Sequence, residues 1–290
     1  MTEQEGQAVS HFFDRVAEHY DQYAVLQREI GSRLLERLDF RRFEPGVILD
    51  LGCATGDSSR ILAGQFPDAR VCALDCSPAM LAELKPVDGD NLSGLCADMH
   101  ALPLAPDSVD LVFSNLALSW GRDVQAIFTG LRRIMKPGAI LVFTCFGPDT
   151  LYELKSAWRK TGGHPPIPTF PDMHDVGDEL VRAGFREPVM DADHLTLEYP
   201  DLPALLIELE ATGITVIGGE NWHGSISASG PGPLSEAYAR SQDGDRFPAV
   251  FEIIYGTAFA PEEGQPVKTA EGDVATFSVD SLRVKSTRRT

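Results

Sequence analysis

The stretch that most constrains the fold is residues 48–56, which read Ile-Leu-Asp-Leu-Gly-Cys-Ala-Thr-Gly and join an apolar strand to a glycine turn. Gly52 and Gly56 carry no side chain, so the backbone can turn sharply there or touch a ligand. Asp50 places a carboxylate near the carboxyl end of the strand, where open α/β sheets bind their ligands. The pattern predicts a strand, a ligand-binding turn and a helix.

The turn departs from the dinucleotide-binding fingerprint, Gly-x-Gly-x-x-Gly. Ala54 stands at the middle glycine, and the outer glycines are one residue too close together. A carboxylate two residues before the first glycine would repel a phosphate, but it can accept hydrogen bonds from an amino group. The ligand expected at this turn is therefore nucleoside-like and partly positive.

Two further strands end in acidic residues. Residues 70–75 form a short apolar strand that ends in Asp75, nineteen positions after Gly56, a spacing that fits one helix and one strand. A carboxylate at that place can accept hydrogen bonds from both hydroxyl groups of a ribose. Residues 96–99 close a third strand and include Asp98. The sequence thus predicts three carboxylates along one edge of a sheet.

The rest of residues 46–146 continues the alternation of strands and helices. Residues 109–115 and 140–144 predict a fourth and a fifth strand, both apolar enough to be buried on two faces. The helix between these strands is expected to stop at residues 136–138, Lys-Pro-Gly. Four such alternations in about a hundred residues predict an α/β fold with a doubly wound parallel sheet.

Residues 50–56 resemble the first motif of the class I S-adenosylmethionine-dependent methyltransferases, which has the form Asp-x-Gly-Cys-x-x-Gly. The resemblance implies a Rossmann-like, seven-stranded sheet and S-adenosyl-L-methionine as methyl donor. In this family Asp75 would bind the ribose, and Asp98 and Met99 would contact the adenine. The cofactor-binding residues that the resemblance implies are Asp50, Gly52, Cys53, Gly56, Asp75, Cys76, Asp98, Met99 and Asn115.

The segment before the sheet is amphipathic. Apolar and aromatic residues recur between residues 12 and 26 at three- and four-residue steps, which predicts one or two helices. Residues 13–27, 114–120 and 146–154 resemble the malonyl-acyl-carrier-protein O-methyltransferases of biotin synthesis. In methyltransferases of this build the first helix lies over the cofactor, which would place Tyr20 near its methionine end; alternatively, the apolar face only packs on the sheet.

This second resemblance extends from about residue 9 to residue 258 and implies methyl transfer to the free carboxylate of malonyl-acyl carrier protein. A malonyl carboxylate is ionised at neutral pH and needs no general base. A buried anion needs a cationic partner, for which we favour Arg246, with Arg159 or Lys155 as alternatives. The predicted catalytic and substrate-pocket residues are Tyr20, Asn115, Trp120 and Arg246.

The chain is expected to have four parts. Residues 1–45 form an N-terminal helical cap, and residues 46–146 form the cofactor-binding core. Residues 147–260 supply a helical lid and C-terminal strands that complete the same domain, with loops at 162–166 and 217–233, which are rich in glycine, serine, histidine and proline. Residues 261–290 are polar, contain proline and glycine, and predict a loosely ordered tail.

Composition restricts the partners. A net charge of -18 argues against nucleic acid as substrate, since phosphate binding needs a basic surface. No apolar run approaches the ~18 residues that a membrane span requires. The odd number of cysteines, five, indicates reduced thiols in a cytoplasmic protein, and the seven scattered histidines lack metal-ligand spacing, so no metal is expected.

Other functions stay open at this level. The sheet also resembles the arginine-hydroxylase relatives of this family that act in the assembly of respiratory complexes, which suggests a cofactor-binding protein-modification or assembly factor. A methyltransferase for a small acid is a further alternative. The thioester could be carried by coenzyme A instead of acyl carrier protein, and the sequence does not distinguish the two carriers.

Overall fold

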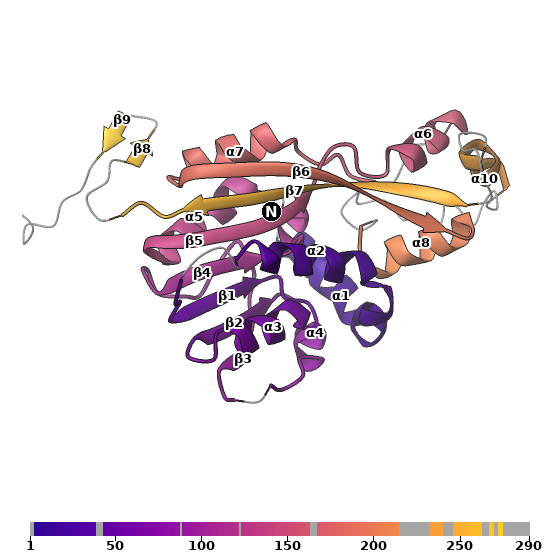
Figure 1. The fold of residues 1–290 in the computed structure, drawn as a ribbon. Coiled ribbons are helices and arrows are strands. Elements are labelled where there is room, and N and C mark those ends of the chain that lie inside the picture. The colour runs from indigo at the N-terminus through magenta and orange to yellow at the C-terminus, as the bar shows by residue number, and fades with distance from the viewer. Residues whose placement is uncertain are drawn as a thin grey trace, which may run out of the picture.

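The computed structural model describes residues 3–38, 43–87, 89–121, 123–162, 167–214, 232–239, 246–262, 267–269 and 272–274. Its centre is a seven-stranded sheet in the order β3-β2-β1-β4-β5-β7-β6 (Figure 1). The strands are β1 (Val47–Leu51), β2 (Arg70–Asp75), β3 (Leu92–Cys96), β4 (Val109–Ser114), β5 (Met135–Phe146), β6 (Arg186–Tyr199) and β7 (Phe247–Phe259). β1 to β5 are parallel, whereas β7 is antiparallel to β5 and β6. The predicted α/β class and seven-stranded sheet are confirmed.

Helices cover both faces of this sheet (Figure 1). Successive residues of β1 show why: Ile48 and Leu49 are fully buried, yet they belong to two different apolar clusters. The cluster around Ile48 is completed by α2 and α3, and the cluster around Leu49 by α5 and α7. The described helices are α1 (Glu3–Tyr23), α2 (Val25–Glu36), α3 (Asp57–Gln65), α4 (Pro78–Ala82), the 3-10 helix η1 (Ala117–Trp120), α5 (Val124–Ile134), α6 (Tyr152–Lys160), α7 (Met173–Arg182), α8 (Leu202–Ala211) and α10 (Gly232–Ala239).

The fifth strand begins earlier than predicted. Residues 136–138 were expected to lie between a helix and a strand, but β5 already starts at Met135, which pairs with Val109. Gly138 adopts a φ of +75°, and the pairing of β4 with β5 shifts register between Val109 and Leu111. Lys-Pro-Gly therefore forms an irregularity inside a long strand, because the glycine accepts a conformation that other residues rarely adopt.

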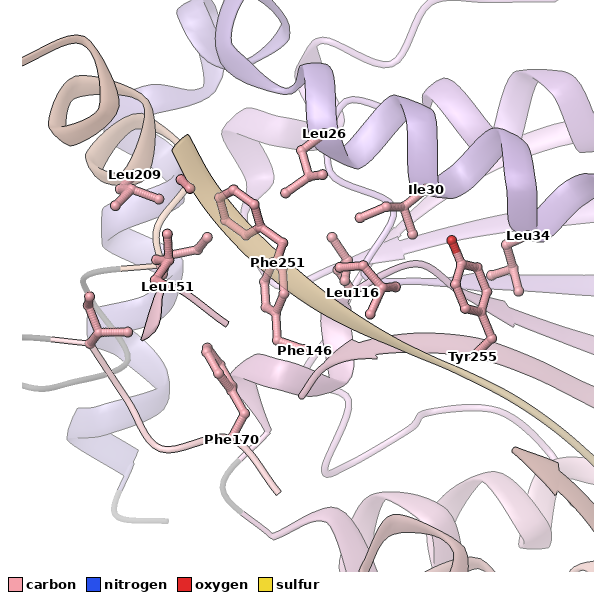
Figure 2. Packing of buried hydrophobic residues seen from close by; sticks show 14 of the residues in the cluster. Leu26, Ile30, Leu34, Leu116, Phe146, Leu151, Phe170, Leu209, Phe251 and Tyr255 are labelled. Atoms are coloured by element: carbon pink, nitrogen blue, oxygen red, sulfur yellow. The ribbon is translucent and has the colours of Figure 1, made fainter. Parts of the chain in front are cut away.

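The N-terminal cap, the sheet and the lid share one apolar core (Figure 2). Leu26 and Ile30 of α2 pack towards Phe251 of β7, and Phe146 at the end of β5 lies between Phe251 and Phe170. The ring centroid of Phe146 lies 6.2 Å from that of Phe251 and 5.2 Å from that of Phe170. Residues far apart in the sequence are thus buried together at the carboxyl end of the parallel strands.

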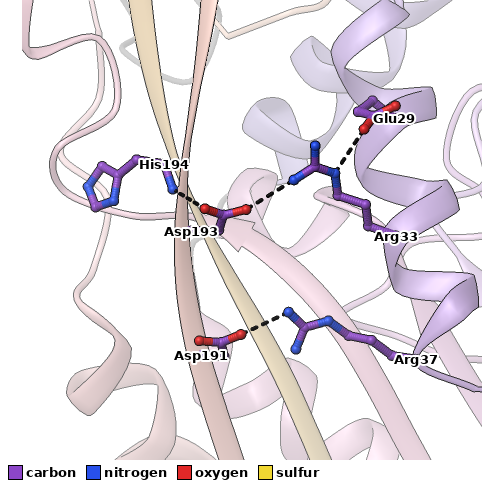
Figure 3. A network of polar contacts seen from close by, with 6 residues as sticks. All are labelled: Glu29, Arg33, Arg37, Asp191, Asp193 and His194. Atoms are coloured by element: carbon purple, nitrogen blue, oxygen red, sulfur yellow. Dashed lines mark hydrogen bonds and ion pairs between the residues drawn. The ribbon is translucent and has the colours of Figure 1, made fainter. Parts of the chain in front are cut away.

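Ion pairs attach α2 to the outer strand of the sheet (Figure 3). Arg33 pairs with Asp193 at 3.0 Å, and Arg37 pairs with Asp191 at 2.8 Å. The guanidinium of Arg37 also lies 4.0 Å from the centre of the Tyr255 ring. Exposed pairs of this kind each contribute little stability. The buried apolar side chains of α2 pack the helix on the sheet, and the ion pairs lie along the edge of this contact.

The tail is not entirely irregular. Within the stretch for which we expect a loosely ordered tail, β8 (Val267–Thr269) and β9 (Gly272–Val274) pair in antiparallel fashion with each other. The predicted loops at 163–166 and 217–231 lie outside the described residues, whereas 232 and 233 begin α10. Across the described parts of the chain, no helix combines the length and the apolar character that crossing a membrane requires.

Candidate cofactor site

A cavity of about 690 Å³ opens where β1, β2, β3 and β4 end, beneath helices α1 and α2. This volume is typical of sites for drug-sized ligands. Of the predicted cofactor-binding residues, all except Gly56 line the cavity: Asp50, Gly52, Cys53, Asp75, Cys76, Asp98, Met99 and Asn115. Tyr20 and Trp120 line it as well. The structure thus brings these residues together around one cavity.

The turn between β1 and α3 is shaped by left-handed backbone conformations. Gly52, Ala54 and Gly56 have φ angles of 72°, 48° and 80°. The backbone N–H groups of Gly52 and Cys53 both donate to the carbonyl oxygen of Leu74, at 2.8 and 3.0 Å. Gly56 precedes the first turn of α3 and takes no part in the cavity wall. Glycine tolerates the positive φ at this position better than other residues do. This explains why the motif has a glycine here although Gly56 does not line the cavity.

Asp75 connects this turn to the turn between β2 and α4. One carboxylate oxygen accepts from the N–H of Ala54 at 2.9 Å, and the other accepts from the N–H of Ser77 at 2.8 Å. The side chain is buried, and burial raises its pKa. Ala54, which departs from the common glycine, thus contributes its backbone amide to Asp75, and its methyl group is accommodated in a left-handed conformation.

Asp50 is a buried carboxylate at the floor of the cavity. It is 1 % exposed and accepts a short hydrogen bond from the hydroxyl group of Ser59. Burial raises its pKa to about 7, and the nearby charges of Asp75 and Asp57 add to the shift. A buried anion without a cationic partner is costly. The site would therefore be stabilised by a positively charged group in the cavity.

This pKa predicts how stability depends on pH in the unliganded protein. The pKa in the folded state lies above the value of the unfolded chain, so the folded state binds more protons and should lose stability as the pH rises through about 7. Between pH 6 and pH 8 the loss due to Asp50 should be on the order of 1 kcal/mol. Asp50→Asn should abolish this part of the loss, as measured by urea unfolding at both pH values. An unchanged pH dependence in the variant would contradict the assignment.

The first two helices bring residues to the cavity that the sequence analysis missed. The hydroxyl group of Thr55 in the turn donates to Asp21 of α1 at 2.6 Å. Arg28 of α2 donates to the backbone carbonyl of Asp21, also at 2.6 Å. Within the described residues, Arg28 is the sole lysine or arginine that lines the cavity. It would pair a carboxylate bound close to the turn.

Asn115 joins α2 to the end of β4. Its side-chain amide donates to the backbone carbonyl of Gln27 at 2.7 Å, and its carbonyl accepts from Thr144 at 2.8 Å. These contacts orient the side chain and hold α2 over the sheet. This role of Asn115 depends on how α2 packs on the sheet, so the sequence alone does not reveal it.

Tyr20 and Trp120 form part of an aromatic wall. Phe13 lies between them, with ring centroids 6.3 Å from Tyr20 and 5.8 Å from Trp120. Burial raises the pKa of Tyr20, so its hydroxyl group stays protonated and acts as a hydrogen-bond donor. The indole N–H of Trp120 is buried and has no hydrogen-bond partner among the described residues. The wall combines apolar surface with neutral donors.

The predicted cationic partners of the substrate lie elsewhere. Arg246 is 61 % exposed, 4.0 Å from the carboxylate of Glu198, and lines no part of the cavity. The separation of Arg246 from the cavity follows from the strand pairing. Phe146 at the end of β5 pairs with Ile253, and Arg246 lies seven residues before Ile253, which is roughly 20 Å further along an extended chain. The sequence prediction for Arg246 is therefore not supported by its position.

The alternatives Lys155 and Arg159 are also outside the cavity wall. Lys155 is a buried residue of α6, where its ammonium donates to the carbonyl of Pro148 at 3.3 Å and lies 5.6 Å from the Phe170 ring centre. Arg159 is in the last turn of α6. Neither residue can pair an anion in the cavity from these positions.

One group of possible metal ligands occurs in the described residues, and it is separate from the cavity. Asp149, His194 and Glu252 bring one ligand atom each to within 4.8 Å of the others. Glu252 already accepts from the backbone N–H of Asp149 at 2.8 Å, and Asp149 and His194 are exposed. Exposed acidic groups of this kind are common without a metal, and none of the three lines the cavity.

Comparison with solved structures finds a similar fold in other proteins. Haemonchus contortus phosphoethanolamine N-methyltransferase 2, in a complex with S-adenosylhomocysteine, aligns with a TM-score of 0.55 at 18% identity, covering 88% of this chain and 60% of that one. The YcgJ protein of Bacillus subtilis aligns with a TM-score of 0.53 at 13% identity, covering 79% and 98%. At these identities the likeness concerns the fold alone.

Comparison of sequences is more specific. Residues 49–143 match the family described as "Methyltransferase domain". The malonyl-[acyl-carrier protein] O-methyltransferase of Gallionella capsiferriformans is 40% identical over 262 residues, which are 88% of this chain and 90% of that protein. The protein of the same name from Halorhodospira halophila is 40% identical over 276 residues, 93% of each chain. With this identity over nearly its whole length, the chain belongs to the malonyl-[acyl-carrier protein] O-methyltransferase family.

Proposed function

We propose that this protein transfers the methyl group of S-adenosyl-L-methionine to the free carboxylate of a malonyl group on acyl carrier protein, a step of biotin synthesis. The observation that carries the proposal is the 40% identity to malonyl-[acyl-carrier protein] O-methyltransferases over most of the chain. The chemistry of the cavity agrees with the cofactor, because it combines buried carboxylates, a single arginine and an aromatic wall.

The residues of the cavity fit the parts of S-adenosyl-L-methionine. Asp75, Asp98 and Met99 all line the cavity; Asp75 would accept from the ribose hydroxyl groups, and Asp98 and Met99 would contact the adenine. The cationic end of the cofactor would offset the cost of ionising Asp50. Arg28, held beside the turn by Asp21, would pair the carboxylate of the methionine part.

When bound, the cofactor supplies a sulfonium methyl group, which is already activated for transfer. In the reaction a bond forms between the malonyl oxygen and the methyl carbon while the bond between that carbon and sulfur breaks. The protein's part is alignment and exclusion of water, which is worth up to several kcal/mol in well-oriented systems. Phe13 and Trp120 provide an apolar wall for this, and Tyr20 offers a neutral donor that orients an anion without removing its charge.

The proposal predicts a specific product. We expect purified protein, incubated with S-adenosyl-L-methionine and malonyl-acyl carrier protein, to add one methyl group to the carrier, as detected by intact mass spectrometry. Cleavage of the thioester should release this methyl group together with the malonyl group, because the methyl group is esterified to the malonyl carboxylate. Acetyl-acyl carrier protein is the control, since it has no free carboxylate and should stay unmodified.

Each other outcome points to a different function. Methylation of malonyl-coenzyme A in preference to the carrier protein would assign the coenzyme as carrier. Binding of S-adenosylhomocysteine without any methylation of either thioester would contradict the proposed substrate. The small-acid and assembly-factor alternatives would then be tested next.

A further inference from the structure

The carboxylate of Asp98 is held by one neighbouring residue. A single oxygen, Oδ1, accepts from the backbone N–H of His100 at 2.9 Å and is 2.8 Å from the ring nitrogen Nδ1 of His100. Because an ionised carboxylate only accepts hydrogen bonds, the ring nitrogen must carry the proton in this contact. The second oxygen, Oδ2, accepts no hydrogen bond from the described residues, and the Asp98 side chain is 44 % exposed.

The ring of His100 makes no other hydrogen bond or ion pair among the described residues. Its other nitrogen, Nε2, is buried and lacks a hydrogen-bond partner, and the side chain is only 16 % exposed. A buried polar atom without a partner costs stability. An apolar side chain of similar size would avoid that cost, so packing alone does not account for a histidine here. The contact of its ring with Asp98 accounts for the histidine.

We propose that His100 is a positioning residue that orients Asp98 so that Oδ2 meets the exocyclic amino group of the adenine. The inference rests on the proposed cofactor site. Both residues line the cavity just beyond β3, and a carboxylate oxygen is a suitable acceptor for that amino group. The backbone hydrogen bond alone holds this half-exposed carboxylate through a single contact, and the second contact from the ring restricts its rotation before the ligand binds, which removes an entropic cost from binding.

Two substitutions of His100 separate positioning from packing. In His100→Asn the amide nitrogen occupies the place of Nδ1 and can still donate to Asp98, whereas His100→Leu fills the space but donates nothing. Two ligands then isolate the amino group: S-adenosylhomocysteine, and S-inosylhomocysteine, in which a carbonyl oxygen replaces it. Affinities are measured by calorimetry on the intact protein, and thermal unfolding checks that each variant is folded.

We expect His100→Leu to bind S-adenosylhomocysteine about ten-fold more weakly than the wild type, with its affinity for S-inosylhomocysteine unchanged. His100→Asn should stay within about two-fold of the wild type for both ligands. Equal losses for the two ligands, no loss at all, or a His100→Asn variant as weak as His100→Leu would overturn the inference. A wild-type protein that binds neither ligand would overturn the proposed cofactor site itself.

Discussion

Asp75→Ala is expected to weaken the binding of S-adenosylhomocysteine by at least about a hundred-fold. In the unliganded protein both carboxylate oxygens already accept backbone hydrogen bonds, from Ala54 and from Ser77. Each oxygen has a second acceptor site that a ribose hydroxyl group can use. The substitution would therefore remove the contacts to the ribose and also release the two turns that enclose it. Calorimetric titration measures the loss directly.

The opposite end of the sheet offers a matched control. Asp110 also accepts from two backbone N–H groups, those of Gly46 at 3.0 Å and Val47 at 2.8 Å, and pairs with Lys136 at 2.8 Å. Asp110→Ala should lower the free energy of unfolding as Asp75→Ala does, but it should leave the affinity for the ligand unchanged. If the two variants lose affinity to the same extent, Asp75 acts only through stability and the ribose contact is wrong.

The positions of the strand ends could be predicted from the sequence because they depend on local patterns. An apolar run that ends near an acidic residue indicates where a buried strand stops, and this placed Asp50, Asp75 and Asp98 at one edge of the sheet. The parallel order of β1 to β5 follows from the alternation of strands and helices. These features need no knowledge of distant contacts.

The residues that were missed depend on packing between distant segments. Arg28 faces the cavity because α2 lies across the sheet, held by its buried apolar side chains and by the hydrogen bond from Asn115. Arg246 is remote because β7 extends well past the end of β5: residues 247–252 pair with β6 alone, and the apolar pattern of β7 does not show which neighbour each of its residues has. Long-range register was therefore beyond the reach of sequence reasoning.

Gly52→Ala should destabilise the protein by about 3–5 kcal/mol. Two effects add: Gly52 has a φ of +72°, which disfavours any side chain, and a Cβ atom there would lie 2.2 Å from the Cβ atom of Ala117 in η1. Two carbon atoms that are not bonded to each other do not approach so closely, so the turn or η1 must shift. A loss of this size is a large part of the stability of an ordinary domain. Urea unfolding of the unliganded protein measures it.

The control is a glycine with free space around it. Gly64 lies in α3, and a Cβ atom added there would meet nothing within 4 Å, so Gly64→Ala should stabilise the protein by about 0.5–1 kcal/mol. Ala117→Gly, introduced into the Gly52→Ala variant, should recover the part of the loss that comes from the close contact. The part due to the positive φ should remain, because it belongs to residue 52 alone. If Ala117→Gly recovers nothing, the contact with η1 does not limit this turn, and backbone conformation alone explains why glycine is required.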